Sequence, residues 1–212
     1  MIGIYGGTFD PVHFGHLRPA LDVYEIAKLD EVRFIPCGQP PHRELPLTDA
    51  QHRLAMLRLA IANQPAFKLD EREIHRKGPS YMVDTLRDLR KDCGAKPLCL
   101  IIGFDAFLGL DSWHEWKHIP ELAHLIITRR PGWDDAGFRA KPALDELVKQ
   151  RQMPVEQLHQ YQVGGLCFIE VTQLDISATY IRKLLQNGRD PHYLLPDSVY
   201  QLIKQEKLYG IT

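Results

Sequence analysis

Residues 1–16 are Met-Ile-Gly-Ile-Tyr-Gly-Gly-Thr-Phe-Asp-Pro-Val-His-Phe-Gly-His, a short apolar run followed by a glycine pair and a polar loop. The run Met1–Tyr5 has the length and composition of a β-strand. Apolar residues near helical spacing follow between Leu17 and Leu29. A strand, a glycine-rich loop and a helix in this order are typical of the first unit of a parallel α/β sheet.

The same alternation continues along the chain. Helical patterns separate further strand-length apolar runs at 31–36, 67–73, 98–102, 122–128 and 166–171. Thr48 and Ser80 are predicted to cap two of the helices, and two more helices are predicted to begin near Ser177 and Asp197. This order predicts an α/β fold: a Rossmann-like, doubly wound, mostly parallel sheet with helices on both faces.

The length of the chain bears on its domain organisation. A chain of 212 residues can bury one sizeable core, so residues 1–212 are expected to form a single domain. Gly132, Pro142 and Pro154 punctuate residues 132–164, which are expected to form a surface insertion containing one amphipathic helix. Residues 176–212 are expected to form a C-terminal helical part.

Charge and cysteine content exclude several classes of protein. Lys and Arg number 26 against 27 Asp and Glu, a net charge of −1, which argues against a protein that coats nucleic acid. No apolar run approaches the roughly 18 residues that span a membrane, and the first residues lack the features of a signal peptide. The four cysteines form no C-x-x-C pair. We therefore expect a cytoplasmic protein without nucleic-acid or membrane partners, either a monomer or a homodimer.

Glycine, histidine and arginine gather where the predicted strands end. The segments that follow the strands include 6–16, 40–43, 103–105, 129–132 and 176–182. Because parallel strands end at one edge of a sheet, these segments are expected to lie close together, where ligands of doubly wound sheets bind. Local cationic groups on a protein without overall positive charge predict a small polyanionic ligand, for which a nucleotide is the natural candidate.

The segment 6–16 has the residues of an anion site. Gly6 and Gly7 are expected to let the backbone turn sharply and approach a ligand. A helix that begins near His16 would direct its N-terminal N–H groups at the same place. His13 and His16 add hydrogen-bond donors that gain charge beside a phosphate, and Gly15 between them is expected to leave room for that phosphate.

The segment 176–182, Ile-Ser-Ala-Thr-Tyr-Ile-Arg, repeats this logic near the end of the chain. Ser177 is a predicted helix cap, and Thr179 and Arg182 lie on one face of the helix that follows. Neither segment is a P-loop, because the sequence contains no G-x-x-x-x-G-K-[ST] motif.

The segments 6–16 and 176–182 resemble the two signature segments of the nucleotidyltransferase superfamily. With Pro40-Pro41-His42-Arg43, Ser80-Tyr81, Gly103-Phe104-Asp105 and Ser112-Trp113 in this order, the chain resembles the bacterial nicotinate-nucleotide adenylyltransferase family. The resemblance runs along the whole chain and is weakest in 132–164. It implies transfer of AMP from ATP to nicotinate mononucleotide, with release of pyrophosphate, by in-line attack without a covalent enzyme intermediate.

The resemblance also implies roles for individual residues. The catalytic residues that it implies are His13, His16 and Arg182. The ATP site that it implies contains Gly7, Thr8, Phe9, His16, Gly103, Asp105, Ser177, Thr179 and Arg182. The acceptor site that it implies contains Arg43, Val83, Trp113 and His114. No protein metal site is expected, because Mg²⁺ would bridge phosphates and be held mainly by ATP and water.

Three alternatives remain open at this point. The first is another adenylyltransferase of the superfamily, acting on nicotinamide mononucleotide or phosphopantetheine. The family usually has Thr where this chain has Met82, so backbone donors rather than a side-chain hydroxyl are expected to bind the acceptor carboxylate. A nucleotide sensor without catalytic activity is the second. The third is a zinc peptidase, because His114-Glu115-Trp116-Lys117-His118 matches the H-E-x-x-H pattern, although Pro120 would shorten the required helix.

Overall fold

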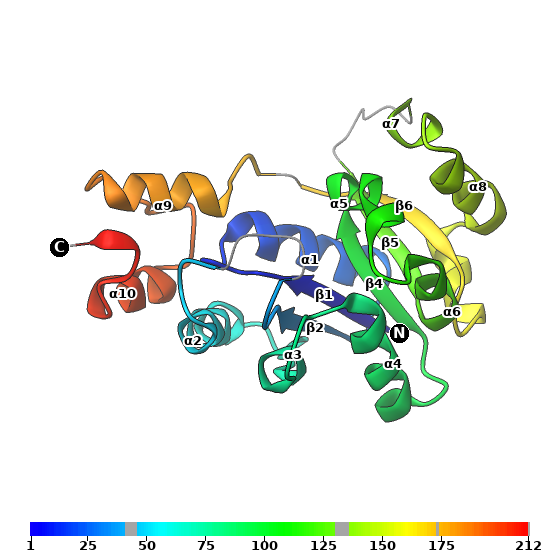
Figure 1. Cartoon of the computed structure of the whole chain (residues 1–212), viewed down its shortest axis with the longest axis horizontal. Coiled ribbons are helices and arrows are strands. Elements are labelled where there is room, and N and C mark those ends of the chain that lie inside the picture. Colours follow the sequence, from blue (N-terminus) through cyan, green and yellow to red (C-terminus); the bar gives the residue numbers. More distant parts are fainter. Residues whose placement is uncertain (41–45, 130–135, 173, 212) are drawn as a thin grey trace.

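The computed structural model describes residues 1–40, 46–129, 136–172 and 174–211, which contain a six-stranded parallel sheet (Figure 1). Its strands follow the order β3-β2-β1-β4-β5-β6 across the sheet. Their bounds are Ile2–Gly7 for β1, Glu31–Pro36 for β2, Phe67–Leu69 for β3, Leu98–Gly103 for β4, His124–Arg129 for β5 and Leu166–Glu170 for β6. The predicted doubly wound α/β fold is confirmed, and every described strand pair is parallel.

Helices connect the strands and cover the sheet. They are α1 (Phe14–Ile26), α2 (Ala50–Ile61), α3 (Arg72–His75), α4 (Met82–Cys93), α5 (Phe104–Leu108), α6 (Ile119–Leu122), α7 (Ala136–Arg139), α8 (Pro142–Arg151), α9 (Ala178–Gln186) and α10 (Asp197–Gln205). Short 3₁₀ turns lie at η1 (Leu110–Ser112), η2 (Trp116–His118), η3 (Val155–Gln160) and η4 (Leu208–Gly210). No helix in the described part of the chain is both long and apolar enough to cross a membrane.

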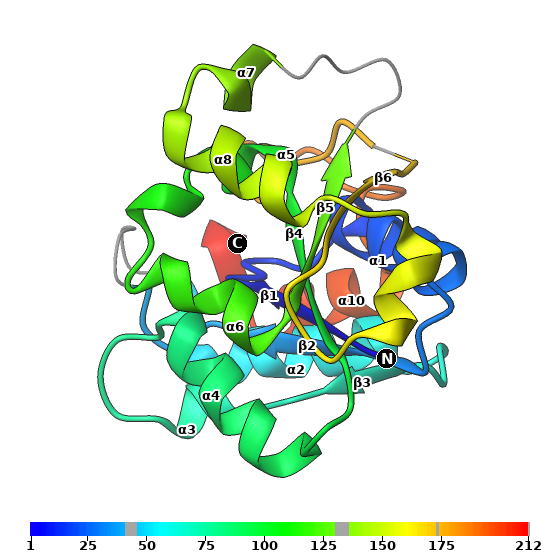
Figure 2. The ribbon, with the colours of Figure 1, turned by 90° about the vertical axis from the view of Figure 1, so that its right-hand side faces the viewer.

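Two hydrophobic cores lie on opposite faces of the sheet, because successive strand side chains point in opposite directions. Within β4, Leu98, Leu100 and Ile102 belong to one core, whereas Cys99 and Ile101 belong to the other. The first core is closed by α4, α5, α6 and α8, and the second by α1, α2, α9 and α10. Figure 2 shows α4 and α6 on one side of the sheet and α1 on the other. Burial on both faces explains the continuous apolar residues at 98–102 in β4 and 125–127 in β5.

Three local predictions were wrong by a few residues. Asp49, not Thr48, caps α2, because its carboxylate accepts the N–H of His52 at 2.9 Å while Thr48 is buried. The N-cap of α4 is Tyr81. Ser80 instead accepts backbone N–H groups from the loop after β2. The strand predicted at 67–73 ends at Leu69, after which α3 begins.

The segment predicted as a surface insertion, 132–164, contributes to both cores where the structure describes it. Phe138, Leu144 and Val148 are buried in the core beside β4 and α4. Leu158 is buried in the opposite core, and Nε2 of His159 lies 3.1 Å from the carbonyl oxygen of Ala27. Two helices and a 3₁₀ turn stand where one amphipathic helix was predicted.

Candidate active site

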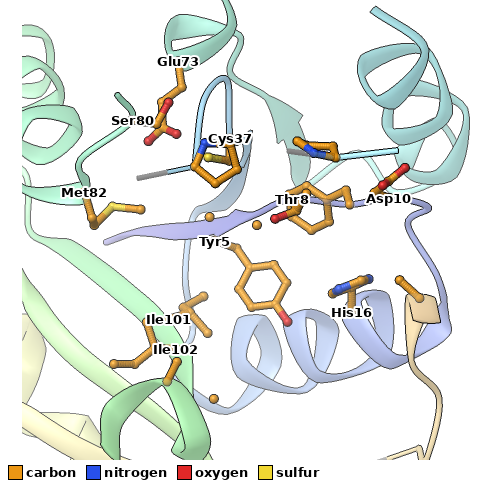
Figure 3. A pocket seen from close by; sticks show the side chains of 18 of the residues that line it. Tyr5, Thr8, Asp10, His16, Cys37, Glu73, Ser80, Met82, Ile101 and Ile102 are labelled. Atoms are coloured by element: carbon orange, nitrogen blue, oxygen red, sulfur yellow. The ribbon is translucent and has the colours of Figure 1, made fainter. Parts of the chain in front are cut away.

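A cavity of about 780 Å³ opens at the carboxyl ends of β1, β2 and β4. The strand order reverses between β1 and β4: β2 and β3 extend the sheet beyond β1, and β5 and β6 extend it beyond β4. Such a reversal creates the crevice in which doubly wound sheets bind ligands. Figure 3 shows Thr8, Asp10 and His16 on one side of the cavity and Ser80, Met82 and Glu73 on the other. The cavity is therefore two-sided, with the loop after β1 and the start of α1 on one side and α3 and the start of α4 on the other.

The loop after β1 turns later than predicted. Gly6 and Gly7 belong to the strand, and neither has a positive φ; the turn comes at Phe9, whose φ is 50°. A Cβ atom on Gly7 would lie 2.9 Å from the Phe9 ring, and one on Gly6 would lie 2.6 Å from Cε of Met82. The prediction of a sharp turn at these glycines was thus wrong. Instead, the missing side chain of Gly7 leaves room for the Phe9 ring, and that of Gly6 leaves room for the thioether of Met82.

His13 and His16 form a stacked pair at the start of α1, with ring centroids 3.8 Å apart. The backbone N–H of His13 donates to Nδ1 of His16 at 3.3 Å. A neutral His16 therefore carries its proton on Nε2, which becomes the donor available to a ligand. His16 lines the cavity, whereas His13 lies behind it with only 4% of its surface exposed.

Burial controls the charge of both rings. It lowers the pKa of His13 to about 4, and burial together with the neighbouring His13 lowers the pKa of His16 well below its usual range. Nδ1 of His13 is buried without a hydrogen-bond partner among the described residues. A Cβ atom on Gly15 would lie 2.9 Å from the His13 ring and 3.0 Å from the Ile176 carbonyl oxygen, so Gly15 allows this packing.

The helix α9 brings the second motif to the same side of the cavity. Ser177 is its N-cap, as predicted, with Oγ accepting the N–H of Tyr180 at 3.1 Å. Arg182 donates from Nη2 to Oγ1 of Thr179 at 3.2 Å and from Nη1 to the carbonyl oxygen of Asp10 at 2.7 Å. Thr179 and Arg182 line the cavity. The two motifs, 160 residues apart in the sequence, are thus joined by a hydrogen bond.

Aromatic residues form the opposite side. The rings of Tyr81 and His114 lie 4.2 Å apart, and Trp113 lines the cavity beside them. The Val83 side chain is fully buried, but its backbone N–H lies in the first turn of α4, where helical bonds leave N–H groups unpaired. Arg43 lies outside the described residues.

The structure brings most of the predicted ATP residues to the cavity. Its described lining includes Gly7, Thr8, Phe9, His16, Gly103, Thr179 and Arg182. Asp105, an exposed residue of α5, and the capping residue Ser177 are not part of that lining. Asp105 lies in the first turn of α5, directly after β4, and Ser177 is the N-cap of α9; both are exposed.

Arg53 is a residue of the site that the sequence analysis missed. Its side chain on α2 is buried, and Nη1 donates to the carbonyl oxygen of Thr8 at 2.7 Å. Nη2 reaches the carbonyl oxygen of Gly38 at 3.4 Å, so one guanidinium holds the loops after β1 and β2 together. Arg53 precedes Met56 by three residues and Leu57 by four, so it lies on the apolar face of α2. This spacing was the available signal that its side chain is buried.

A second set of hydrogen bonds that the sequence did not predict joins the loop after β2 to α3 and α4, on the side of the cavity opposite His16. Oγ of Ser80 accepts the N–H groups of Gly38 and Gln39, at 3.1 and 3.2 Å, and its hydroxyl bonds to buried Glu73. The hydroxyl of Thr85 also donates to Glu73, at 2.6 Å. Burial raises the pKa of Glu73, whereas these hydrogen bonds oppose the shift.

The H-E-x-x-H match does not form a zinc-binding helix. Glu115 has a φ of 48°, which interrupts any helix between His114 and His118. Glu115 pairs with Arg87, and His118 Nδ1 lies 2.8 Å from Glu121. In the described residues, no three His, Cys, Asp or Glu side chains are grouped to hold a metal ion. The geometry contradicts the zinc-peptidase alternative.

The profile of the family described as cytidylyltransferase-like matches residues 4–184, which include both motifs and all of the sheet except the first residues of β1. The chain belongs to this family. Its similarity to curated members extends over nearly the full length. It is 52% identical to the probable nicotinate-nucleotide adenylyltransferase of Methylococcus capsulatus, covering 99% of this chain and 100% of that protein. It is 45% identical to the probable nicotinate-nucleotide adenylyltransferase of Aeromonas hydrophila, covering 98% and 96%.

A solved structure supports the fold independently. The nicotinic acid mononucleotide adenylyltransferase of Plasmodium falciparum, complexed with NaAD, matches with a TM-score of 0.75 over 100% of this chain and 98% of that chain. Because the two sequences are only 20% identical, this likeness concerns the fold of the cytidylyltransferase-like family.

The buried histidine pair predicts how stability depends on pH. The pKa of His13 is about 4 in the folded protein and about 6.5 when unfolded, so the unfolded chain binds more protons between these values. The free energy of unfolding should therefore be highest above pH 6.5 and fall by about 3 kcal/mol towards pH 4 through this group. Urea unfolding at pH 7.5, 6 and 5 measures this dependence. His13→Gln should flatten it, and an unchanged slope in that variant would contradict the assignment.

Proposed function

We propose that the protein transfers AMP from ATP to nicotinate mononucleotide in this cavity, giving nicotinate adenine dinucleotide and pyrophosphate in NAD biosynthesis. One observation carries the proposal: the cavity combines a side of phosphate-binding character with an aromatic side. The first contains His16, Thr179 and Arg182, and the second contains Tyr81 and Trp113. Full-length relatives that bear this enzyme's name support the same reaction.

ATP binds on the side formed by the two motifs. His16 donates from Nε2 to the α-phosphate, and Arg182 with Thr179 holds the phosphates that leave as pyrophosphate. The Gly7 backbone and Thr8 contact the same phosphates from the loop after β1. His13 supports the His16 ring from behind, and Ser177 acts through the helix that it caps. Asp105 and Gly103 remain the proposed contacts to the adenosine end.

Nicotinate mononucleotide binds on the opposite side. Trp113 offers a flat face to the pyridine ring, and the N–H groups of Val83 and His114 are the proposed donors to its carboxylate. Met82 presents a thioether where a hydroxyl would otherwise stand, so backbone donors carry this recognition. Arg43 is the proposed partner of the mononucleotide phosphate.

The reaction needs no protein nucleophile. The phosphate of the mononucleotide attacks the α-phosphorus of ATP directly, so catalysis consists of positioning and stabilisation of developing charge. The backbone bond to Nδ1 keeps the His16 proton on Nε2, so the neutral ring directs this donor at the transferring phosphate. The donor is in place before negative charge builds on the transferring group.

Mg²⁺ enters this proposal with ATP. The two carboxylates in the described lining of the cavity are already engaged, Asp10 with Tyr209 and Leu47 and Glu73 with Ser80 and Thr85. Phosphate and water oxygens would therefore hold the ion, which neutralises charge on the phosphates.

A product assay tests the reaction. Purified protein with ATP, Mg²⁺ and nicotinate mononucleotide should release pyrophosphate and form a dinucleotide detectable by chromatography. Parallel reactions with nicotinamide mononucleotide and phosphopantetheine test the two rival acceptors, and we expect slower turnover with both. A nucleotide sensor would bind ATP in the same experiment without releasing pyrophosphate. Absence of product with nicotinate mononucleotide would refute the proposed function.

His16→Ala should lower kcat by about 100-fold or more, because a donor directed at the transferring phosphate stabilises charge in the transition state. Steady-state rates of pyrophosphate release measure the loss, and circular dichroism checks that the fold persists. His75→Ala is the matched control, because His75 is exposed on α3 and outside the described cavity lining. A near-wild-type rate for His16→Ala would remove its catalytic role.

Trp113→Ala should raise the KM for nicotinate mononucleotide by about 10-fold and leave the KM for ATP nearly unchanged, because loss of ring stacking weakens acceptor binding. Trp116→Ala is the control, since Trp116 packs against the same core but is absent from the described cavity lining. Equal acceptor KM values for Trp113→Ala and wild type would contradict the stacking assignment.

A further inference from the structure

The C-terminal turn reaches the site through a single hydroxyl. Tyr209 lies in η4, which packs against α9 and α10, as the red segment of Figure 1 shows. Its ring is buried with 9% of its surface exposed, and its hydroxyl donates to Oδ1 of Asp10 at 2.7 Å. Burial, together with the adjacent Asp10 carboxylate, raises the pKa of Tyr209, so the phenol keeps the proton that it donates.

Asp10 is fixed from three directions. Besides the hydroxyl of Tyr209, its carboxylate accepts the backbone N–H of Leu47 at Oδ2, at 2.9 Å. Its carbonyl oxygen accepts Nη1 of Arg182 at 2.7 Å. Asp10 is 5% exposed, and Asp10, Leu47 and Arg182 all line the cavity. One residue therefore connects the loop after β1, the chain entering α2, and the arginine of α9.

The direction of Arg182 depends on this arrangement. The bonds to Asp10 and to Oγ1 of Thr179 involve two of the guanidinium's nitrogens and leave further N–H donors for a ligand. The Asp10 side chain is bonded at both carboxylate oxygens, so it anchors the backbone at residue 10, and this backbone carries the carbonyl oxygen that Arg182 binds. Removal of the Tyr209 hydroxyl leaves one carboxylate oxygen of a buried residue without its donor, a strong reason for it to shift.

We propose that Tyr209 is a positioning residue for the nucleotide: its hydroxyl holds the Asp10 carboxylate, and Asp10 in turn directs Arg182 at the polyphosphate of a nucleoside triphosphate. The inference rests on the proposed function only in naming ATP as the ligand of Arg182. Tyr209 itself contacts no ligand. The ring packs in the same core as Met56, so replacement by phenylalanine keeps the ring and removes the hydroxyl, which also bonds to the side chain of Thr48.

Tyr209→Phe is the test. Calorimetry with a non-hydrolysable ATP analogue should give a Kd about 5- to 10-fold above that of the wild-type protein. In pyrophosphate-release assays the KM for ATP should rise by a similar factor, while kcat changes less than twofold. Wild-type affinity of Tyr209→Phe for the analogue would overturn the proposal.

Two control variants separate positioning from stability. Tyr200→Phe removes a hydroxyl from α10, which lies next to η4, and should bind the analogue as the wild type does. Ile203→Val removes a buried methyl group from the same helix, and should lower the melting temperature without changing the analogue Kd. If Ile203→Val weakens binding as much as Tyr209→Phe, the hydroxyl acts only through stability and the proposal fails.

A double-variant comparison identifies the route. In an Arg182→Lys background, Tyr209→Phe should cause no further loss of analogue affinity, because the group that it positions is already altered. If the two substitutions raise the analogue Kd independently, so that their fold-changes multiply, the proposed route through Arg182 is wrong. The calorimetry is independent of the acceptor: absence of dinucleotide product refutes the proposed reaction alone, whereas failure of the wild-type protein to bind the analogue refutes both.

Discussion

Burial of a parallel sheet on both faces is the constraint from which the rest of this structure follows. Alternate residues of β4 and β5 enter two different cores, so neither face is left to form a surface site. Polar chemistry is confined to the edge where the strands end. Between β1 and β4 the helices leave for opposite faces, and the loops there separate enough to form the cavity.

The same burial sets the electrostatics of the cavity. His13 and His16 stack at the first turn of α1, where a charge on one ring opposes a charge on the other and where little water stabilises either. Both are neutral when the cavity is empty, and the backbone bond to Nδ1 fixes the proton of His16 on Nε2. A ring whose one donor is already directed at the phosphate site needs no rearrangement as charge develops during phosphoryl transfer.

Sequence patterns predicted the elements with alternating or continuous apolar residues most accurately. The predicted strand at 31–36 is confirmed at both ends, because hydrophobic periodicity is a local property. Of the predicted caps, Ser177 is confirmed, whereas Thr48 and Ser80 each lie one residue before the observed cap. Interactions between distant residues left no such local pattern. Arg53 and Tyr209 act on loops 45 and 199 residues away, and Gly7 serves the ring of Phe9 rather than a turn. The cavity edge was predictable from strand order, whereas the residues that hold its loops were not.

The missed residues share one physical role. The side chains of Arg53, Ser80 and Asp10 each bind backbone groups of loops that border the cavity, and each residue is buried. Buried polar groups favour one geometry strongly, because any alternative leaves a donor or acceptor unpaired away from water. The backbone groups bound in this way, at Thr8, Gly38 and Leu47, are therefore held by folding rather than by the ligand, so binding energy is not consumed in arranging them. For a reaction that relies on alignment of two phosphates rather than on a protein nucleophile, this prior ordering is the protein's main catalytic contribution.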